Sequence, residues 1–77
     1  MFNVIIAALD GVLFQGEALS VTLPAKEGEI TVLRNHVSLL SPLKEGVITV
    51  RNSGESKEFP VKSGIIEVSP KGLTVLL

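Results

Sequence analysis

The feature that most constrains this chain is a rhythm of short apolar runs, which turn signals interrupt about every 8–12 residues. Val, Ile and Leu dominate these runs, and their branched side chains suit a pleated surface better than a helix. Breaks such as Asn52-Ser53-Gly54 carry the residue types that favour tight turns. The spacing is typical of a small β-sandwich or barrel, and no longer window shows a clean helical pattern. We therefore expect an all-β fold, with a single domain over 1–77.

Turn chemistry and alternation predict details of the first part of the chain. Asp10-Gly11 predicts a two-residue hairpin turn, because both positions tolerate a positive φ. Gly16 predicts a bulge or a bend in the run that follows. Over 18–23, large apolar residues alternate with small or polar ones, with Leu19 on the apolar side. This alternation predicts a strand with one buried and one exposed face.

Three prolines and one glutamate carry further expectations. Pro24 and Pro42 are expected to end the runs that contain them, because proline has no N–H to donate. Pro60 lies inside the run 55–61, so this strand is expected at the edge of a sheet. Glu67 alternates with its two apolar neighbours and is therefore expected to point outward.

Composition excludes several classes of protein. With 77 residues and no Cys, stability must come from apolar packing or from a partner. Seven Lys and Arg against eight Asp and Glu give no basic face for nucleic acid, and no Trp or Tyr is present to stack on bases. No apolar run reaches the roughly 20 residues that span a bilayer. The N-terminal apolar stretch has no basic flank, which argues against a signal peptide.

The candidates for chemistry are few. His36 is the only histidine, and a zinc site would need further ligands. Neither Ser38 nor Ser41 stands in a nucleophile motif with an orienting acid. Glu27 and Glu29 could form a carboxylate pair, but their surroundings are typical of a solvated loop. We expect no catalytic, cofactor-binding or metal-binding residue, although a small enzyme using His36 remains an alternative.

Six segments, in order along the chain, resemble segments of the ATP synthase epsilon subunit family. DGVLFQGE is similar to the family's PDGxx(Y/F)xGE, LPAKEGEI to VPGxxGEL, and VLRNHVSLL to ILPGHAPLL. KEGVI is similar to KPGx(V/I), SGIIEV to (S/G)GFxEV, and LTVL to VTVL. These segments occupy 10–17, 23–30, 32–40, 44–48, 63–68 and 73–76. The chain departs from the family where Thr31 replaces Gly and where Arg34 and Ser38 replace Pro, in a region expected to meet partners.

The resemblance implies the N-terminal β-sandwich of an F-type epsilon subunit, with ten strands. It implies a non-catalytic rotor subunit of the central stalk (the CF(1)/F1 part), which links the gamma subunit to the polar loops of the c-ring and couples proton transport to ATP synthesis. Such a subunit is peripheral, at the cytoplasmic face of the inner or plasma membrane, or on the matrix or stromal side in an organelle. The chain stops at Leu77, so we expect it to lack the family's C-terminal helical hairpin and the inhibition that depends on it.

The resemblance also implies where partners bind. The 27–29 loop matches the part of the family that approaches the c-ring, and the His36 loop matches a part near gamma and the ring. Apolar residues at successive positions in 37–40 and 65–66 are expected to form a partner patch. A stand-alone β-sandwich adaptor module is the main alternative. The expected interface residues are Glu27, Gly28, Glu29, Arg34, His36, Val37 and Ile65.

Overall fold

The computed structural model describes residues 1–34 and 38–77, which form nine β-strands and no helix. The strands are β1 (Phe2–Ala8), β2 (Gly11–Ala18), β3 (Ser20–Ala25), β4 (Gly28–Leu33), β5 (Leu39–Leu43), β6 (Gly46–Asn52), β7 (Glu55–Val61), β8 (Gly64–Ser69) and β9 (Gly72–Leu76). The expectation of an all-β chain is therefore confirmed. The described residues form nine strands where the resemblance implied ten.

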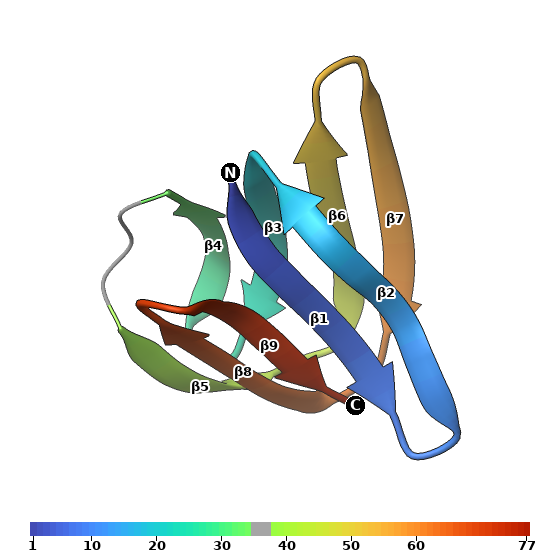
Figure 1. Cartoon of the computed structure of the whole chain (residues 1–77). Coiled ribbons are helices and arrows are strands. Elements are labelled where there is room, and N and C mark those ends of the chain that lie inside the picture. Colours follow the sequence, from blue (N-terminus) through green and yellow to red (C-terminus); the bar gives the residue numbers. More distant parts are fainter. Residues whose placement is uncertain (35–37) are drawn as a thin grey trace.

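All nine strands belong to one sheet, which folds back on itself into two layers (Figure 1). The strand order is β2-β1-β9-β8-β5-β3-β6-β7, and β4 pairs with β3. The fold line lies between β5 and β3, which share only the pair Ala25 and Leu43. We call β2, β1, β9, β8 and β5 the first layer, and β4, β3, β6 and β7 the second. All pairings are antiparallel except that of β1 with β9.

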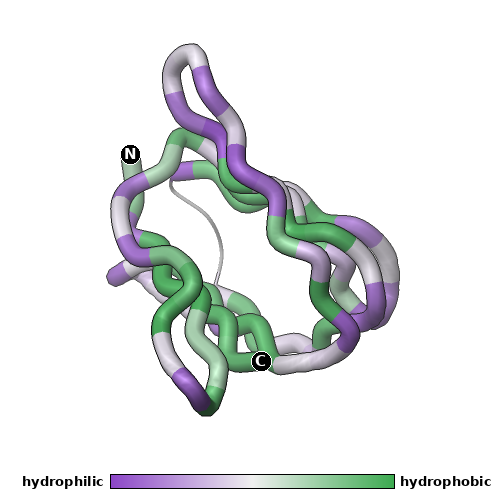
Figure 2. The backbone as a smooth tube through the Cα atoms, turned by 90° about the vertical axis from the view of Figure 1, so that its right-hand side faces the viewer, coloured by the Kyte–Doolittle hydropathy of each residue, from purple (hydrophilic) through white to green (hydrophobic). Residues whose placement is uncertain are grey.

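The core lies between the layers and is apolar throughout the described residues. Alternate residues of β1, β8 and β9 fill it from the first layer, and those of β3 and β6 fill it from the second. Full burial of each such side chain contributes about 1.5–3 kcal/mol relative to exposure. The largest fully buried side chains are Ile6, Leu23, Ile48, Ile66, Leu73, Val4, Val21, Val50 and Val75. Figure 2 shows the apolar segments in both layers and the hydrophilic β6–β7 hairpin projecting beyond them.

The first hairpin forms as predicted, but its two-residue turn lies one residue earlier in the chain than expected. Leu9 and Asp10 occupy the turn, and Gly11 already pairs with Ala8 as the first residue of β2. The bulge or bend predicted at Gly16 does not occur there, because Gly16 lies within β2 and pairs regularly with Val4 of β1. The register shifts instead between Ile6 and Ala7, so that Leu13 is the extra residue. A bulge near the end of a hairpin at a sheet edge is a common way to increase local twist.

Leu19 does not face the core, contrary to the alternation over 18–23. Ala18 and Val21 are both buried, three positions apart, and Leu19 between them is 45% exposed. The chain bends at Leu19 as it passes from the first layer to the second, and there its N–H donates to the Arg51 carbonyl at 2.9 Å. The alternation of inward and outward side chains holds only within one strand. It therefore starts anew after the bend at Leu19, where the chain changes layer.

Pro24 and Pro42 do not end their strands. Pro24 lies inside β3, opposite Glu29, and Pro42 lies inside β5, opposite Ile65. Both prolines stand beside the fold line, where their strands leave one neighbour and meet another. The N–H that each proline lacks therefore falls where the hydrogen-bond ladder is already interrupted.

Two other predictions are confirmed. β7, which contains Pro60, is the last strand of the sheet and pairs only with β6 among the described strands. On β8, Glu67 is exposed, and the residues on either side of it, Ile66 and Val68, are buried.

Candidate functional site

The structure distributes the expected interface residues over different surfaces. Glu27 lies in the β3–β4 turn, and Gly28 and Glu29 begin β4. Arg34 follows the other end of β4, and Ile65 lies in β8 of the opposite layer. His36 and Val37 lie outside the described residues.

An apolar row crosses the outer face of the first layer, one residue from each of its five strands. Ala7 of β1 pairs with Val12 of β2 on one side and with Leu76 of β9 on the other. Leu76 pairs with Ile65 of β8, and Ile65 pairs with Pro42 of β5. Residues directly opposite each other on neighbouring strands share a face of the sheet, so these five side chains form a continuous band. Val12 and Leu76 are each 57% exposed, and Ile65 is 44% exposed.

Polarity rises along the same face with distance from the apolar row. The next row of paired residues mixes apolar and polar side chains: Gln15, Ile5, Thr74, Glu67 and Leu40. The row beyond it is polar apart from a glycine: Glu17, Asn3, Gly72 and Ser69. The apolar side chains are therefore gathered at one end of the face. A contiguous exposed apolar band with a polar border is typical of a protein interaction site.

The predicted partner patch is in part this row. Ile65 belongs to it, and Leu40, which is 73% exposed, lies diagonally beside Ile65. Ile66 does not belong, because it is fully buried in the core. Sequence reasoning missed Val12 and Leu76, since each looks like an ordinary strand residue until the pairing of β2, β1 and β9 is known.

A second surface lies beside the fold line, where the β3–β4 and β5–β6 turns meet. Lys26 and Glu27 are exposed on the first turn, and Lys44 and Glu45 are exposed on the second. The sequence predicted only the first of these two turns as a partner contact. The repeated string Lys-Glu-Gly, at 26–28 and 44–46, was the signal that could have identified the second.

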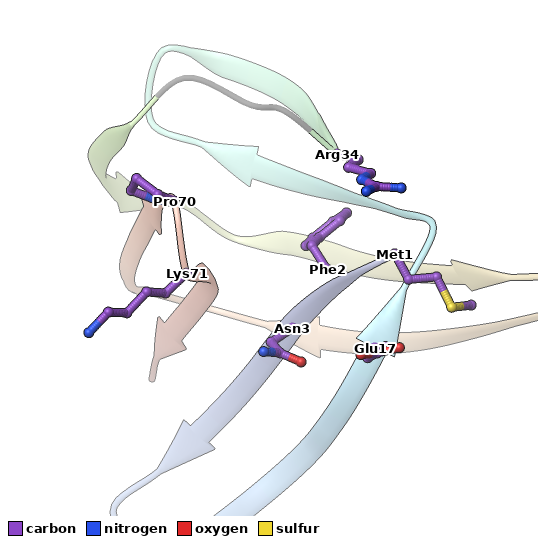
Figure 3. A pocket seen from close by; sticks show the side chains of 7 residues that line it. All are labelled: Met1, Phe2, Asn3, Glu17, Arg34, Pro70 and Lys71. Carbon is purple, nitrogen blue, oxygen red and sulfur yellow. The ribbon is translucent and has the colours of Figure 1, made fainter.

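A polar hollow of about 540 Å³ lies at the opposite end of the strands, beside the start of β1 (Figure 3). Arg34 and Glu17 line it together with Asn3, and the side chain of Lys71 points away from the others. The hollow brings Arg34, an expected interface residue, beside charged and polar residues that the sequence did not single out.

The outer face of the second layer carries a small hydrogen-bond cluster. Arg51 donates from its guanidinium to Thr22 Oγ1 at 3.0 Å, and Thr22 Oγ1 lies 3.1 Å from Thr31 Oγ1. Thr31, one of the departures from the family pattern, thus lies within β4 and contacts its neighbour strand. This cluster is polar, whereas the row through Ile65 on the first layer is apolar.

No group of three or more His, Cys, Asp or Glu in the described part of the chain could hold a metal ion. The same residues include no helix of the length and hydropathy needed to cross a membrane.

Fold and surfaces together define a small β-sandwich domain that presents separate apolar and charged surfaces. The chain belongs to the family described as the ATP synthase, Delta/Epsilon chain, beta-sandwich domain, whose model matches residues 1–77.

Curated relatives named ATP synthase epsilon chain match a shorter segment. The relative from Sulfurimonas denitrificans is 59% identical over 32 residues, which are 42% of this chain and 25% of the relative. One from Campylobacter jejuni is 58% identical over 31 residues, or 40% of this chain and 24% of the relative. The matches therefore span about a quarter of the length of these relatives.

Two solved structures share the fold across nearly the whole chain. A chain in the Euglena gracilis mitochondrial ATP synthase structure, described as OSCP/F1/c-ring, superposes with a TM-score of 0.89 at 20% identity, over 97% of this chain and 49% of that one. A chain in the Tetrahymena thermophila mitochondrial ATP synthase structure, described as central stalk/c-ring, superposes with a TM-score of 0.75 at 17% identity. The superposition covers 99% of this chain and 63% of that one. At these identities the likeness concerns the fold.

Proposed function

We propose that this chain is a non-catalytic rotor subunit in the central stalk of a proton-translocating F-type ATP synthase. It links the gamma subunit to the c-ring, so that rotation of the ring is coupled to ATP synthesis. It is a peripheral subunit of the membrane-bound complex, at the cytoplasmic face or on the matrix or stromal side. Family membership over the whole chain and relatives named ATP synthase epsilon chain support this proposal.

The apolar row of Val12, Ala7, Leu76, Ile65 and Pro42 is the observation that carries the proposal. It is the surface we assign to gamma. Exposed apolar side chains gain free energy when a partner removes them from water, by about 25 cal/mol for each Å² of apolar surface buried. The row is backed by five strands that pair with one another, so binding requires little ordering of the chain.

The charged turns beside the fold line are the surface we assign to the c-ring. Glu27 and Glu29 lie at the β3–β4 junction, with Lys26 next to them, and all three are exposed. The apolar row and these turns adjoin at Pro42, whose carbonyl accepts the N–H of Lys26 at 2.9 Å. One rigid domain thus presents both surfaces side by side, which is what transmission of torque between two partners requires.

A matched pair of substitutions tests the gamma surface. Ile65 and Val47 are each 44% exposed on a strand, but Ile65 lies in the apolar row and Val47 lies on the second layer. Ile65→Asp should weaken binding to the gamma subunit by about tenfold or more, because it places a charge in the centre of an apolar contact. Val47→Asp should bind gamma within about twofold of the parent chain, since exposed positions outside a contact have small effects.

The affinities are measured by titration calorimetry against purified gamma, with thermal melts of all three proteins as the check on folding. Equal affinities for Ile65→Asp and the parent would show that gamma binds elsewhere. A stand-alone adaptor module would give no saturable binding to gamma by any of the three.

A further inference from the structure

The pattern Pro-x-Lys-Glu-Gly occurs twice in this chain, at 24–28 and at 42–46. Each copy runs from the end of one strand into the beginning of the next. The first copy joins β3 to β4, and the second joins β5 to β6. The two copies are far apart in the sequence, but the structure places them side by side at the fold line.

The two copies hold each other by reciprocal hydrogen bonds. Lys26 N donates to the Pro42 carbonyl at 2.9 Å, and Lys44 N donates to the Pro24 carbonyl at 2.8 Å. Between these bonds the second residues of the pattern, Ala25 and Leu43, pair antiparallel. Equivalent positions thus make equivalent backbone hydrogen bonds in opposite directions, so a local pseudo-two-fold axis relates residues 24–26 to residues 42–44. Beyond these residues the turns differ, since Gly28 has a φ of +141° and Gly46 has no positive φ.

Burial follows the same correspondence at four of the five positions. The second residues, Ala25 and Leu43, are 3% and 4% exposed, both lysines and both glutamates are exposed, and both glycines are half-buried. Only the prolines differ, since Pro24 is buried and Pro42 is exposed. Each turn therefore exposes the same charged pair, Lys then Glu.

The two turns are fixed relative to each other. A Cβ atom at Gly46 would lie 2.8 Å from the Cβ of Pro24, so the second turn packs directly onto the first copy of the pattern. Within 1–34 and 38–77, the charged side-chain groups of the two turns make no ion pair and no side-chain hydrogen bond. These residues are Lys26, Glu27, Lys44 and Glu45. Four unpaired charges on a rigid support are available to a partner of mixed charge.

We propose that the two Pro-x-Lys-Glu-Gly turns form one bivalent docking surface for a partner that repeats the same polar loop, with each turn contacting one copy of the loop. This inference rests on the proposed function, in which the c-ring is a partner built from repeated subunits. Two weak, equivalent contacts on one rigid body bind much more tightly than either alone, because the second contact forms at a high effective concentration. Glu45 and Lys44 are then as important for ring binding as Glu27 and Lys26.

Charge reversals at equivalent positions test this. Glu27→Lys and Glu45→Lys are compared with Glu55→Lys, a control that makes the same change at an exposed residue of the β6–β7 hairpin. Each protein is assembled with gamma, and the affinity of the complex for the detergent-solubilised c-ring is measured by surface plasmon resonance. Affinity for gamma alone is measured separately, as the test of the proposed function.

The two turn variants should each weaken ring binding by about tenfold and to a similar degree, because each loses one of two contacts and introduces repulsion. The double variant should lose about 100-fold, and Glu55→Lys should stay within about twofold of the parent. Gamma binding should be unchanged in all of them. A second variant, Lys44→Glu with Glu45→Lys, keeps the net charge and should also weaken ring binding.

Ring binding by Glu45→Lys that equals that of Glu55→Lys would overturn the proposal, even if Glu27→Lys binds weakly. Failure of the parent complex to bind the ring would overturn it too. Neither result would affect the gamma contact. Failure of the parent chain to bind gamma would instead contradict the proposed function, and the ring affinity of the chain alone would then decide whether the turns bind the repeated loops.

Discussion

The ring of Phe14 meets the ring of Phe59 edge to face, with centroids 5.9 Å apart and planes inclined by 63°. Phe14 belongs to β2 and Phe59 to β7, the two strands that end the sheet order. The contact therefore joins the two layers where the described residues show no backbone pairing between these strands. Lys57 Nζ lies 5.7 Å from the centre of the Phe14 ring and adds a cation–π contact.

This aromatic contact should couple the stability of the two layers. In a double-mutant cycle with Phe14→Leu and Phe59→Leu, we expect a coupling free energy of about 0.5–1.5 kcal/mol, the range found for aromatic pairs. Urea unfolding of the four proteins measures it. A coupling near zero would mean that the two rings contribute only by their separate burial.

Two glycines are required by close backbone approach, and a third is not. A Cβ atom at Gly72 would lie 2.3 Å from the Asn3 carbonyl oxygen, and one at Gly64 would lie 2.5 Å from the Leu76 carbonyl oxygen. Gly28 has a similar φ of +141°, but a Cβ there meets nothing within 4 Å. These three positions separate the effect of backbone conformation from the effect of steric contact.

Gly72→Ala should therefore destabilise the domain by more than about 3 kcal/mol, because it combines an unfavourable φ with a clash in the β1–β9 pairing. Gly28→Ala should cost only about 1–2 kcal/mol, since only the backbone conformation opposes it. Thermal and urea unfolding measure both. Equal losses at the two positions would show that the clash is relieved by movement of β1.

The free edge of β7 carries two features that discourage pairing with other chains. Pro60 offers no N–H to an incoming strand, and Lys57 lies opposite the buried Val50 and so shares its inward face. Pro60→Thr with Lys57→Val should make the edge a better template for strand addition. Sedimentation velocity should show the apparent mass of the variant rising with concentration more steeply than that of the parent chain. Identical sedimentation profiles for the variant and the parent chain would show that other residues prevent strand addition at this edge.

The sequence predicted those features of the fold that depend on neighbours within one strand. Pro60 indicated an edge strand because the missing N–H is a property of that residue alone, and Glu67 indicated an outward position because alternation is local. The prediction that Leu19 faces the core was wrong, because the chain changes layer there and nothing in the alternation marks that change. The prediction that Pro42 ends its strand was wrong, because the position of Pro42 beside the fold line depends on β3, which lies far away in the sequence.

The interaction surfaces show the same limit. Ile65 could be chosen from the sequence because it adjoins another apolar residue, and one of the two had to face outward. Val12 and Leu76 could not be chosen, because they join Ile65 only through the pairing of β2, β1, β9 and β8. The two Lys-Glu-Gly strings are visible in the sequence, but only the hydrogen bonds between the turns show that they lie side by side.

Calorimetric titration of the purified gamma subunit with this chain at several temperatures tests the gamma contact itself. We expect saturable one-to-one binding with a negative heat-capacity change, because the apolar row is removed from water in the complex. Absence of saturable binding to a folded gamma subunit would contradict the proposal that this domain binds gamma through its apolar row.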